Sequence, residues 1–263
     1  MHFMGPILFI YYINDIPHQQ NTKLALFADD TAIFCSSWSK NTAVKNAKSH
    51  LDIIQKYFNI WKIKTNATKT ELVVFSRKIK EKVEPIKIDG VKIEAADSAK
   101  YLGVLLDKKL SFTEHINKAV RKAYMPLSCL YNLLSRKSTL STKNKLTLYK
   151  MVIKPVMLYA APIWSNTTVT NVNKLETIQN KILRLIARVE PNTTNLEIRE
   201  SLKMNILWED IHSRTKDCYT IQIQHLEILI VSDVSIYNHE NAPLKSYINY
   251  LIKYLFPQKV CDI

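Results

Sequence analysis

Short apolar runs, separated by polar pairs, make up the first part of the chain. The runs at residues 24–27 and 31–34 flank two adjacent carboxylates, Asp29 and Asp30. This pattern predicts a β-hairpin with the carboxylates at its tip. An ordinary aspartate turn gives the same pattern, because Asp tolerates turn geometry and hydrogen-bonds its own backbone.

Three further segments in this part predict strands. Residues 71–76 form an apolar run, and residues 85–94 predict two short strands joined at Asp89-Gly90, a strong hairpin signal. Residues 100–107 predict one more strand.

Helical spacing dominates elsewhere. One apolar stripe predicts an amphipathic helix of about 20 residues that packs on a sheet, through Val44, Ala47, Leu51, Ile54, Phe58 and Trp61. Three more stripes start at Ile116, Leu146 and Val172, and Pro126 and Pro155 should kink or break the first two of these helices. The chain is therefore predicted to be α+β up to residues 106–113 and helical beyond them.

Composition and charge indicate the size of the core and the kind of binding partner. With 263 residues, 47% of them hydrophobic, the chain can bury a substantial core in one large or two modest domains. Its net charge is +14, and residues 108–188 hold fifteen Lys or Arg residues but only two acids, Glu114 and Glu176. Clustered cations indicate that the chain binds a polyanion, and nucleic acid is favoured over a membrane surface. The alternative is that these cations only form a solvated helical surface.

Other classes are disfavoured. The four cysteines are scattered without zinc-site or disulfide spacing, and three glycines cannot form a Gly-rich phosphate loop. The apolar opening FMGPILFIYYI contains Pro6 and is shorter than the roughly 20 residues of a membrane span, so neither a span nor a signal peptide is expected.

Five motifs in order carry a family resemblance: GPILFIYYINDIP, LALFADDTAIF, WKIKTNATKTELVVF, KYLGVLLDKKLSFTEHI and KPVMLYAAPIW. Residues 4 to about 215 resemble the reverse transcriptase of non-LTR retrotransposons, most of all the jockey-like group. The resemblance implies a right-hand polymerase: a partial palm of antiparallel strands with helices at 1–106, an all-helical thumb at 107–188 and a helical C-terminal extension at 189–263. The fingers and the first palm strand are expected upstream of these residues.

The resemblance also implies site residues. Nucleotidyl transfer uses two divalent cations about 4 Å apart, and Mg²⁺ (or Mn²⁺) prefers carboxylate oxygens. Asp29 matches the family's metal-binding aspartate and Asp30 its less direct neighbour. Lys69 matches a lysine proposed to protonate pyrophosphate, but it could equally be a lysine in a helix-to-strand turn. Asp15 is not expected to be a ligand, because it matches the structural end of a helix.

Other matches concern positioning. Phe27 and Ala28 precede the carboxylates, and Gly5 and Pro6 resemble the end of a motif that positions template and nucleotide. A primer-gripping hairpin is matched by Tyr101, Leu102 and Gly103, although Gly103 could simply serve a turn. The expected phosphate contacts are Lys118, Arg121, Lys122, Lys143, Lys145, Lys150, Lys181 and Arg184.

The implied partners are an RNA template, a DNA primer duplex and deoxynucleoside triphosphates, with no membrane, in cytoplasm and nucleus. Because the family's first metal-binding aspartate is expected upstream, these residues should be inactive alone. Three interpretations stay open: part of a reverse transcriptase, a non-catalytic nucleic-acid-binding module, or a transposon remnant not under selection.

Overall fold

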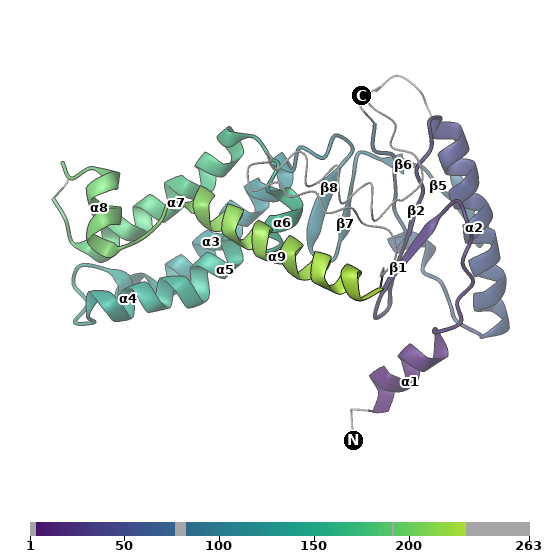
Figure 1. Cartoon of the computed structure of the whole chain (residues 1–263), viewed down its shortest axis with the longest axis horizontal. Helices are drawn as coiled ribbons and strands as arrows, with labels where there is room; N and C mark the ends of the chain where they lie inside the picture. Colours follow the sequence, from purple (N-terminus) through teal and green to yellow (C-terminus); the bar gives the residue numbers. More distant parts are fainter. Residues whose placement is uncertain (1–3, 77–82, 191, 230–263) are drawn as a thin grey trace. The chain divides into compact units, whose positions relative to one another are not determined.

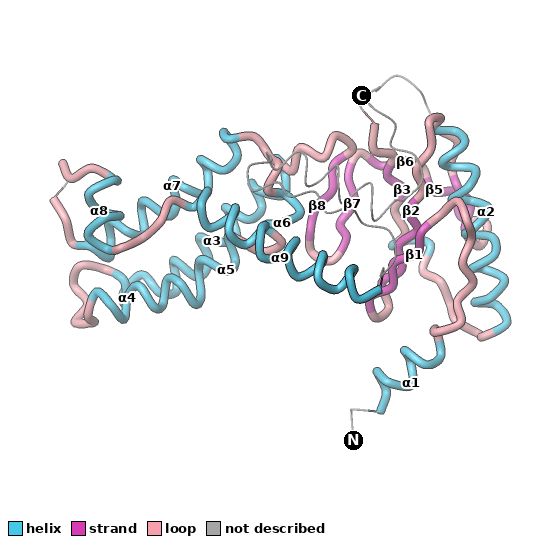
Figure 2. Tube along the Cα trace, in the orientation of Figure 1, coloured by secondary structure: helices cyan, strands magenta, loops and turns pink. Residues whose placement is uncertain are grey.

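The structure is a computed structural model, which describes residues 4–76, 83–190 and 192–229. The chain divides into two compact units between Leu110 and Ser111. The first unit mixes helices with small two-stranded sheets, and the second is helical throughout its described part (Figures 1 and 2). No helix among the described residues is both long and apolar enough to cross a membrane.

The first unit contains two α-helices, a short 3-10 turn and eight strands within its described residues. They are α1 (Met4–Tyr12), β1 (Lys23–Phe27), β2 (Asp30–Phe34), α2 (Lys40–Ile60), the 3-10 turn η1 (Ala67–Lys69), β3 (Leu72–Val73), β4 (Ile86–Ile88), β5 (Val91–Ile93), β6 (Ala95–Ala96), β7 (Ser98–Tyr101) and β8 (Val104–Asp107). The pairs β1–β2, β4–β5 and β7–β8 are antiparallel hairpins, and β3 pairs in parallel with β6.

Helix α2 packs on the β1–β2 hairpin, as its apolar stripe predicts. Ile54 and Tyr57 of α2 form a core with Ile16, and Leu24 and Ile33 of the hairpin pack against that core. The sheet therefore has one face covered by α2, which leaves its other face for the rest of the unit.

Buried polar contacts fix the chain entering this hairpin. The ring of His50, which is buried on α2, hydrogen-bonds the Thr22 hydroxyl at 2.6 Å and the Pro17 carbonyl at 2.9 Å. The Tyr57 hydroxyl donates to Asp15 Oδ1 at 2.6 Å. Burial, and next the bond to the Asp15 carboxylate, raise the pKa of Tyr57 to about 12. Asp15 thus holds α2 in place, as its expected structural position suggests.

Two strand predictions need correction. Only Leu72–Val73 of the predicted strand at 71–76 is extended in a sheet, because its partner β6 is just two residues long. The predicted single strand at 100–107 is wrong: it contains the turn of a hairpin. Leu102 and Gly103 have φ values of 44° and 81°, and positive φ at both central residues reverses the chain in two residues.

The second unit consists of seven α-helices and one π-helical turn over its described residues. They are α3 (Thr113–Leu134), α4 (Thr142–Leu148), the π-turn η2 (Tyr149–Ile153), α5 (Lys154–Met157), α6 (Ala161–Trp164), α7 (Val169–Ala187), α8 (Asn195–Leu202) and α9 (Leu207–Leu229). Helices α3 and α7 pack together over buried apolar side chains that include Ile116, Ala123, Leu175 and Ile178.

The two prolines behave differently from one another. Helix α3 runs unbroken through Pro126, so of the predicted kink or break the break does not occur there. The carbonyl that Pro126 leaves unbonded belongs to exposed Lys122, where water can satisfy it. Before Pro155 the helix changes to the π-turn, and Pro155 then stands in the first turn of α5, where a proline costs least.

Polar pairs cross-link the helices of the second unit. The buried Tyr149 hydroxyl donates to Gln179 Oε1 at 2.6 Å, and Gln179 Nε2 donates to the Asn205 carbonyl at 3.0 Å. Lys154 and Asp210 form a largely buried ion pair at 2.6 Å. Burial first, then the charges of Asp210 and Glu176, raise the pKa of Tyr149, so this hydroxyl stays a neutral donor.

Candidate active site and nucleic-acid interface

The two adjacent carboxylates lie on the β1–β2 hairpin, as predicted. Phe27 pairs with Asp30, so Ala28 and Asp29 form a two-residue turn and Asp30 is the first residue of β2. The predicted tip is thus displaced by one residue. Ala28 has a φ of 49°, a left-handed conformation that side chains with a Cβ rarely adopt and that often accompanies functional turns.

Strand alternation separates the two faces of this hairpin. Leu24 and Ile33 face α2, so Asp30, Ala32 and Phe34 lie on the opposite face. On that face Phe34 contacts Tyr101 edge to face, with 6.2 Å between ring centroids. Burial, followed by the charge of Asp30, raises the pKa of Tyr101. The fold therefore brings the carboxylate hairpin against the β7–β8 hairpin, although Phe34 and Tyr101 lie 67 residues apart in sequence.

The carboxylates themselves are open to solvent. Asp29 and Asp30 are both exposed, and the Phe27 side chain beside them is 63% exposed rather than part of the core. Among the described residues, no group of three or more His, Cys, Asp or Glu side chains could hold a metal ion. The hairpin thus offers two hard oxygen ligands and leaves further positions to water, substrate or other ligands.

Lys69 stands at the end of a 3-10 turn, and its side chain is exposed. Asn66 caps this turn by accepting from the Thr68 amide at 3.1 Å. Two residues after Lys69, Glu71 Oε2 accepts from the Lys100 amide at 3.0 Å. Glu71, which the motifs did not single out, therefore ties the Lys69 turn to the strand that carries Tyr101.

Gly5 and Pro6 are in a different environment. Both lie in α1, where Gly5 is exposed with open space around its Cα. The contacts of α1 go to the end of α2: the rings of Tyr12 and Trp61 lie 5.0 Å apart, and the Tyr12 hydroxyl donates to the Trp61 carbonyl. These contacts tie α1 to the end of α2.

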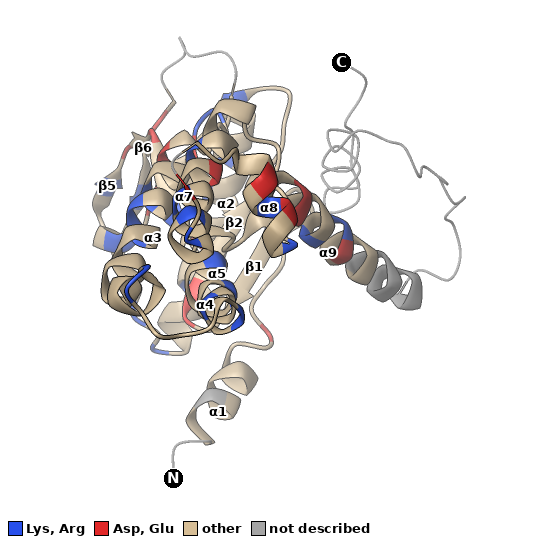
Figure 3. Cartoon of the chain, turned by 90° about the vertical axis from the view of Figure 1, so that its left-hand side faces the viewer, with Lys and Arg blue, Asp and Glu red and all other residues tan. Residues whose placement is uncertain are grey.

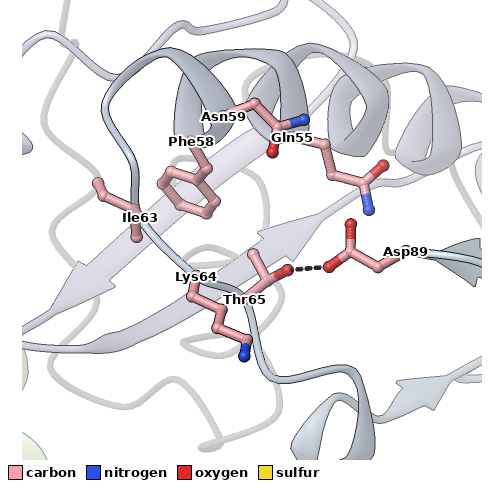
Figure 4. A pocket seen from close by; sticks show the side chains of 7 residues that line it. All are labelled: Gln55, Phe58, Asn59, Ile63, Lys64, Thr65 and Asp89. Carbon is pink, nitrogen blue, oxygen red and sulfur yellow. Dashed lines mark hydrogen bonds between the residues drawn. The ribbon is translucent and has the colours of Figure 1, made fainter.

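A polar cavity of about 180 Å³ lies elsewhere in the first unit (Figure 4). It opens between the end of α2 and the turn of the β4–β5 hairpin, where Thr65 donates to Asp89 at 2.7 Å. None of the predicted catalytic or primer-gripping residues lines it. The cavity is therefore distinct from the carboxylate hairpin.

In the second unit, six of the eight predicted phosphate contacts are exposed: Lys118, Arg121, Lys122, Lys143, Lys150 and Lys181. Both acids of this stretch are already paired, Glu114 with Lys118 at 3.6 Å and Glu176 with Arg199. Basic positions recur along α3, α4 and α7, while acidic positions lie on both α8 and α9 (Figure 3). The positive charge of these helices is therefore largely uncompensated.

Two of the eight differ from the prediction. Lys145 is only 1% exposed, and its Nζ donates to the Ser135 carbonyl at 2.7 Å. Lys145 must therefore be removed from the expected surface contacts. Arg184 is half-buried and donates to the Thr193 carbonyl at 2.8 Å and to Asn195 Oδ1 at 2.9 Å, so part of its guanidinium is already engaged by the loop before α8 and by the first residue of that helix.

Comparisons with known proteins agree with the motifs. The family model described as reverse transcriptase (RNA-dependent DNA polymerase) matches residues 3–106. In Drosophila melanogaster, the probable RNA-directed DNA polymerase from transposon X-element is 30% identical over 217 residues, which cover 81% of this chain and 24% of that protein. The corresponding protein from transposon BS is 30% identical over 221 residues, with the same two coverages.

A third relative extends the match. The RNA-directed DNA polymerase from mobile element jockey of Drosophila funebris is 26% identical over 267 residues, which cover 98% of this chain and 29% of that protein. No solved structure matches the chain. The chain spans about a quarter of the length of these relatives. These similarities confirm the recognition made from the motifs: the chain is related to the RNA-directed DNA polymerases of jockey-like non-LTR retrotransposons, and residues 3–106 match the reverse transcriptase family.

Proposed function

We propose that this chain supplies the Asp29-Asp30 carboxylates and part of the template–primer surface of an RNA-directed DNA polymerase. The observation that carries the proposal is the contact between two hairpins. Asp30 lies on the face of β1–β2 that turns away from α2, and Phe34 on that face contacts Tyr101 of β7–β8. A carboxylate beside a primer-binding hairpin is the juxtaposition that nucleotidyl transfer requires.

The donor set suits Mg²⁺ or Mn²⁺. Both cations prefer carboxylate oxygens, and Asp29 and Asp30 are adjacent, exposed and close to a hairpin turn that two strands hold in place. When bound, a divalent cation would activate the primer hydroxyl and neutralise triphosphate charge. Asp29 would be the direct ligand, and Asp30 would hold the turn and add negative charge.

Other residues of the first unit would orient the substrates. The Leu102-Gly103 turn would approach the primer backbone beside the carboxylates, and Phe27 and Ala28 would border the nucleotide. Lys69, on an exposed turn that Glu71 ties to β7, would donate a proton to departing pyrophosphate. Gly5 and Pro6 would contact template and nucleotide only in a complex that changes the surroundings of α1.

The two units correspond, in this proposal, to part of a palm and to a thumb. The thumb would bind the backbone of an RNA–DNA duplex through its exposed cations, and α8 and α9 would begin the C-terminal extension. We expect residues 1–263 to bind duplex through these cations. A binding module without catalysis is the second candidate, and the uncompensated charge of α3, α4 and α7 favours it.

Metal binding tests the carboxylate site. Mn²⁺ titrated into the protein should enhance water-proton relaxation weakly, and Asp29→Asn should remove most of the enhancement. Asp89→Asn is the matched control, because Asp89 is an exposed aspartate in a two-residue hairpin turn without an adjacent carboxylate. Equal Mn²⁺ binding by the wild type and Asp29→Asn would contradict the site.

A further inference from the structure

Two loops at the ends of α3 and α7 are joined by a reciprocal pair of arginines. Arg136, just after α3, donates from Nη2 to the carbonyl of Val189, and Arg188, at the end of α7, donates from Nη2 to the carbonyl of Ser138. Each arginine therefore reaches across to the backbone of the other loop. Neither residue belongs to the phosphate contacts expected from the sequence.

These bonds leave most of each guanidinium available. A guanidinium carries five N–H donors in a planar fork, and each of these contacts uses one nitrogen. Both arginines are exposed, as is the neighbouring Lys137. Three cationic side chains thus meet at one pair of loops, two of them with orientations fixed by backbone carbonyls.

None of these three cations forms an ion pair with an acidic side chain among the described residues. No acidic residue occurs between Glu114 and Glu176, and Glu190, the acid nearest in sequence to Arg188, forms no ion pair among the described residues. Beneath the loops, buried Lys145 donates to the Ser135 carbonyl. Burial first, and then the charge of Arg188, lower the pKa of Lys145, as two cations near one another would.

We propose that Arg136, Lys137 and Arg188, here called the two-loop cluster, bind a backbone phosphate of the nucleic-acid partner. An arginine fork matches a phosphate bidentately, and holding the fork in advance reduces the entropy lost on binding. The cluster extends the proposed phosphate-binding surface from the exposed Lys and Arg residues of the helices to the loops that follow α3 and α7. It rests on the proposed function, since it presumes a nucleic-acid partner.

Fluorescence anisotropy of a labelled RNA–DNA duplex, measured at several salt concentrations, tests the cluster. Because the cluster binds one phosphate, Arg136→Gln combined with Arg188→Gln should reduce the size of the log–log salt slope by about 0.9, the value per phosphate contact in duplex DNA, and Lys137→Gln should reduce it by part of that amount. Lys87→Gln is the control, because Lys87 is an exposed lysine of β4 in the first unit. It should leave the slope unchanged.

The outcomes separate the two proposals. Wild-type binding without salt dependence would contradict the proposed function itself. Salt-dependent wild-type binding, with unchanged slopes in both cluster variants, would overturn the two-loop cluster alone. If the double arginine variant loses its thermal unfolding transition, Lys137→Gln decides, because that side chain makes no described hydrogen bond. Displacement of the duplex by poly-glutamate as readily as by unlabelled duplex would also overturn a phosphate-specific cluster.

Discussion

Lys145 and Lys150 form a matched pair that tests whether burial, and not charge alone, decides which cations bind duplex. The two lysines are five residues apart in the same helical stretch. Lys145 is 1% exposed and bonded to Ser135, whereas Lys150 is exposed. We expect Lys150→Gln to weaken duplex binding and Lys145→Gln to leave it nearly unchanged.

The magnitude follows from the count of exposed cations. The six exposed helix cations alone, at about 0.9 each, give a log–log salt slope of about −5, and hence a loss of about 10³-fold in affinity between about 50 mM and 200 mM salt; the two-loop cluster would add to this slope. Removing Lys150 should reduce the size of this slope by about 0.9, and removing Lys145 should not change it measurably.

Anisotropy titrations of both variants at four or more salt concentrations provide the assay, with thermal unfolding as the check on folding. Gln at position 145 can still donate to the Ser135 carbonyl, so the helix end should be retained. If folded Lys145→Gln loses as much slope as Lys150→Gln, the assignment of Lys145 to the interior is refuted.

Three further predictions concern stability and ionisation. Gly103→Ala should lower the free energy of unfolding by about 1–2 kcal/mol, because Gly103 has a φ of 81°. Gly5→Ala, within α1, should leave this free energy unchanged or raise it. Urea unfolding in which both variants lose stability would contradict this. Lys154→Met should cost about 3–5 kcal/mol in the same assay by leaving Asp210 buried and unpaired, and a loss below about 1 kcal/mol would count against that ion pair. Tyr101 should titrate above its ordinary value of 10.0; its stabilising contribution is then present below pH 10 and is lost as the pH rises through the raised pKa. Asp30→Asn should lower this pKa, as measured by NMR of the tyrosine ring, and no change would mean that Asp30 and Tyr101 are not neighbours.

Local sequence patterns predicted the helices and hairpins that neighbouring residues alone specify. The Asp89-Gly90 hairpin formed because its turn residues accept positive φ, with values of 48° and 81°. The stripe of α2 specified a helix with one buried face. The β1–β2 hairpin also followed from its alternation.

Non-local and ambiguous features could not be predicted in this way. In residues 100–107 apolar side chains continue across the turn, so the run resembles one strand although Leu102 and Gly103 reverse it. The parallel pairing of β3 with β6 joins segments more than 20 residues apart and leaves no local pattern.

The candidate site shows the same division. Adjacent aspartates identified the carboxylate hairpin, but the contact with Tyr101 depends on tertiary packing. Lys145 looked like its exposed neighbours because a lysine alone does not reveal the carbonyl that draws it inside. Arg136 and Arg188 were missed because they lie at the ends of α3 and α7, and only the structure shows that they reach across to one another's loops.

Primer extension by a chimaera tests the central claim most directly. The upstream part of the X-element relative's polymerase would be fused ahead of Met4, and extension of a DNA primer on an RNA template would be measured with Asp29 and with Asp29→Ala. We predict extension by the Asp29 form, its loss in Asp29→Ala and nearly equal duplex affinity for the two, because the thumb cations carry the phosphate contacts. A chimaera that extends equally well with Ala at position 29 would contradict the assignment of the catalytic carboxylate.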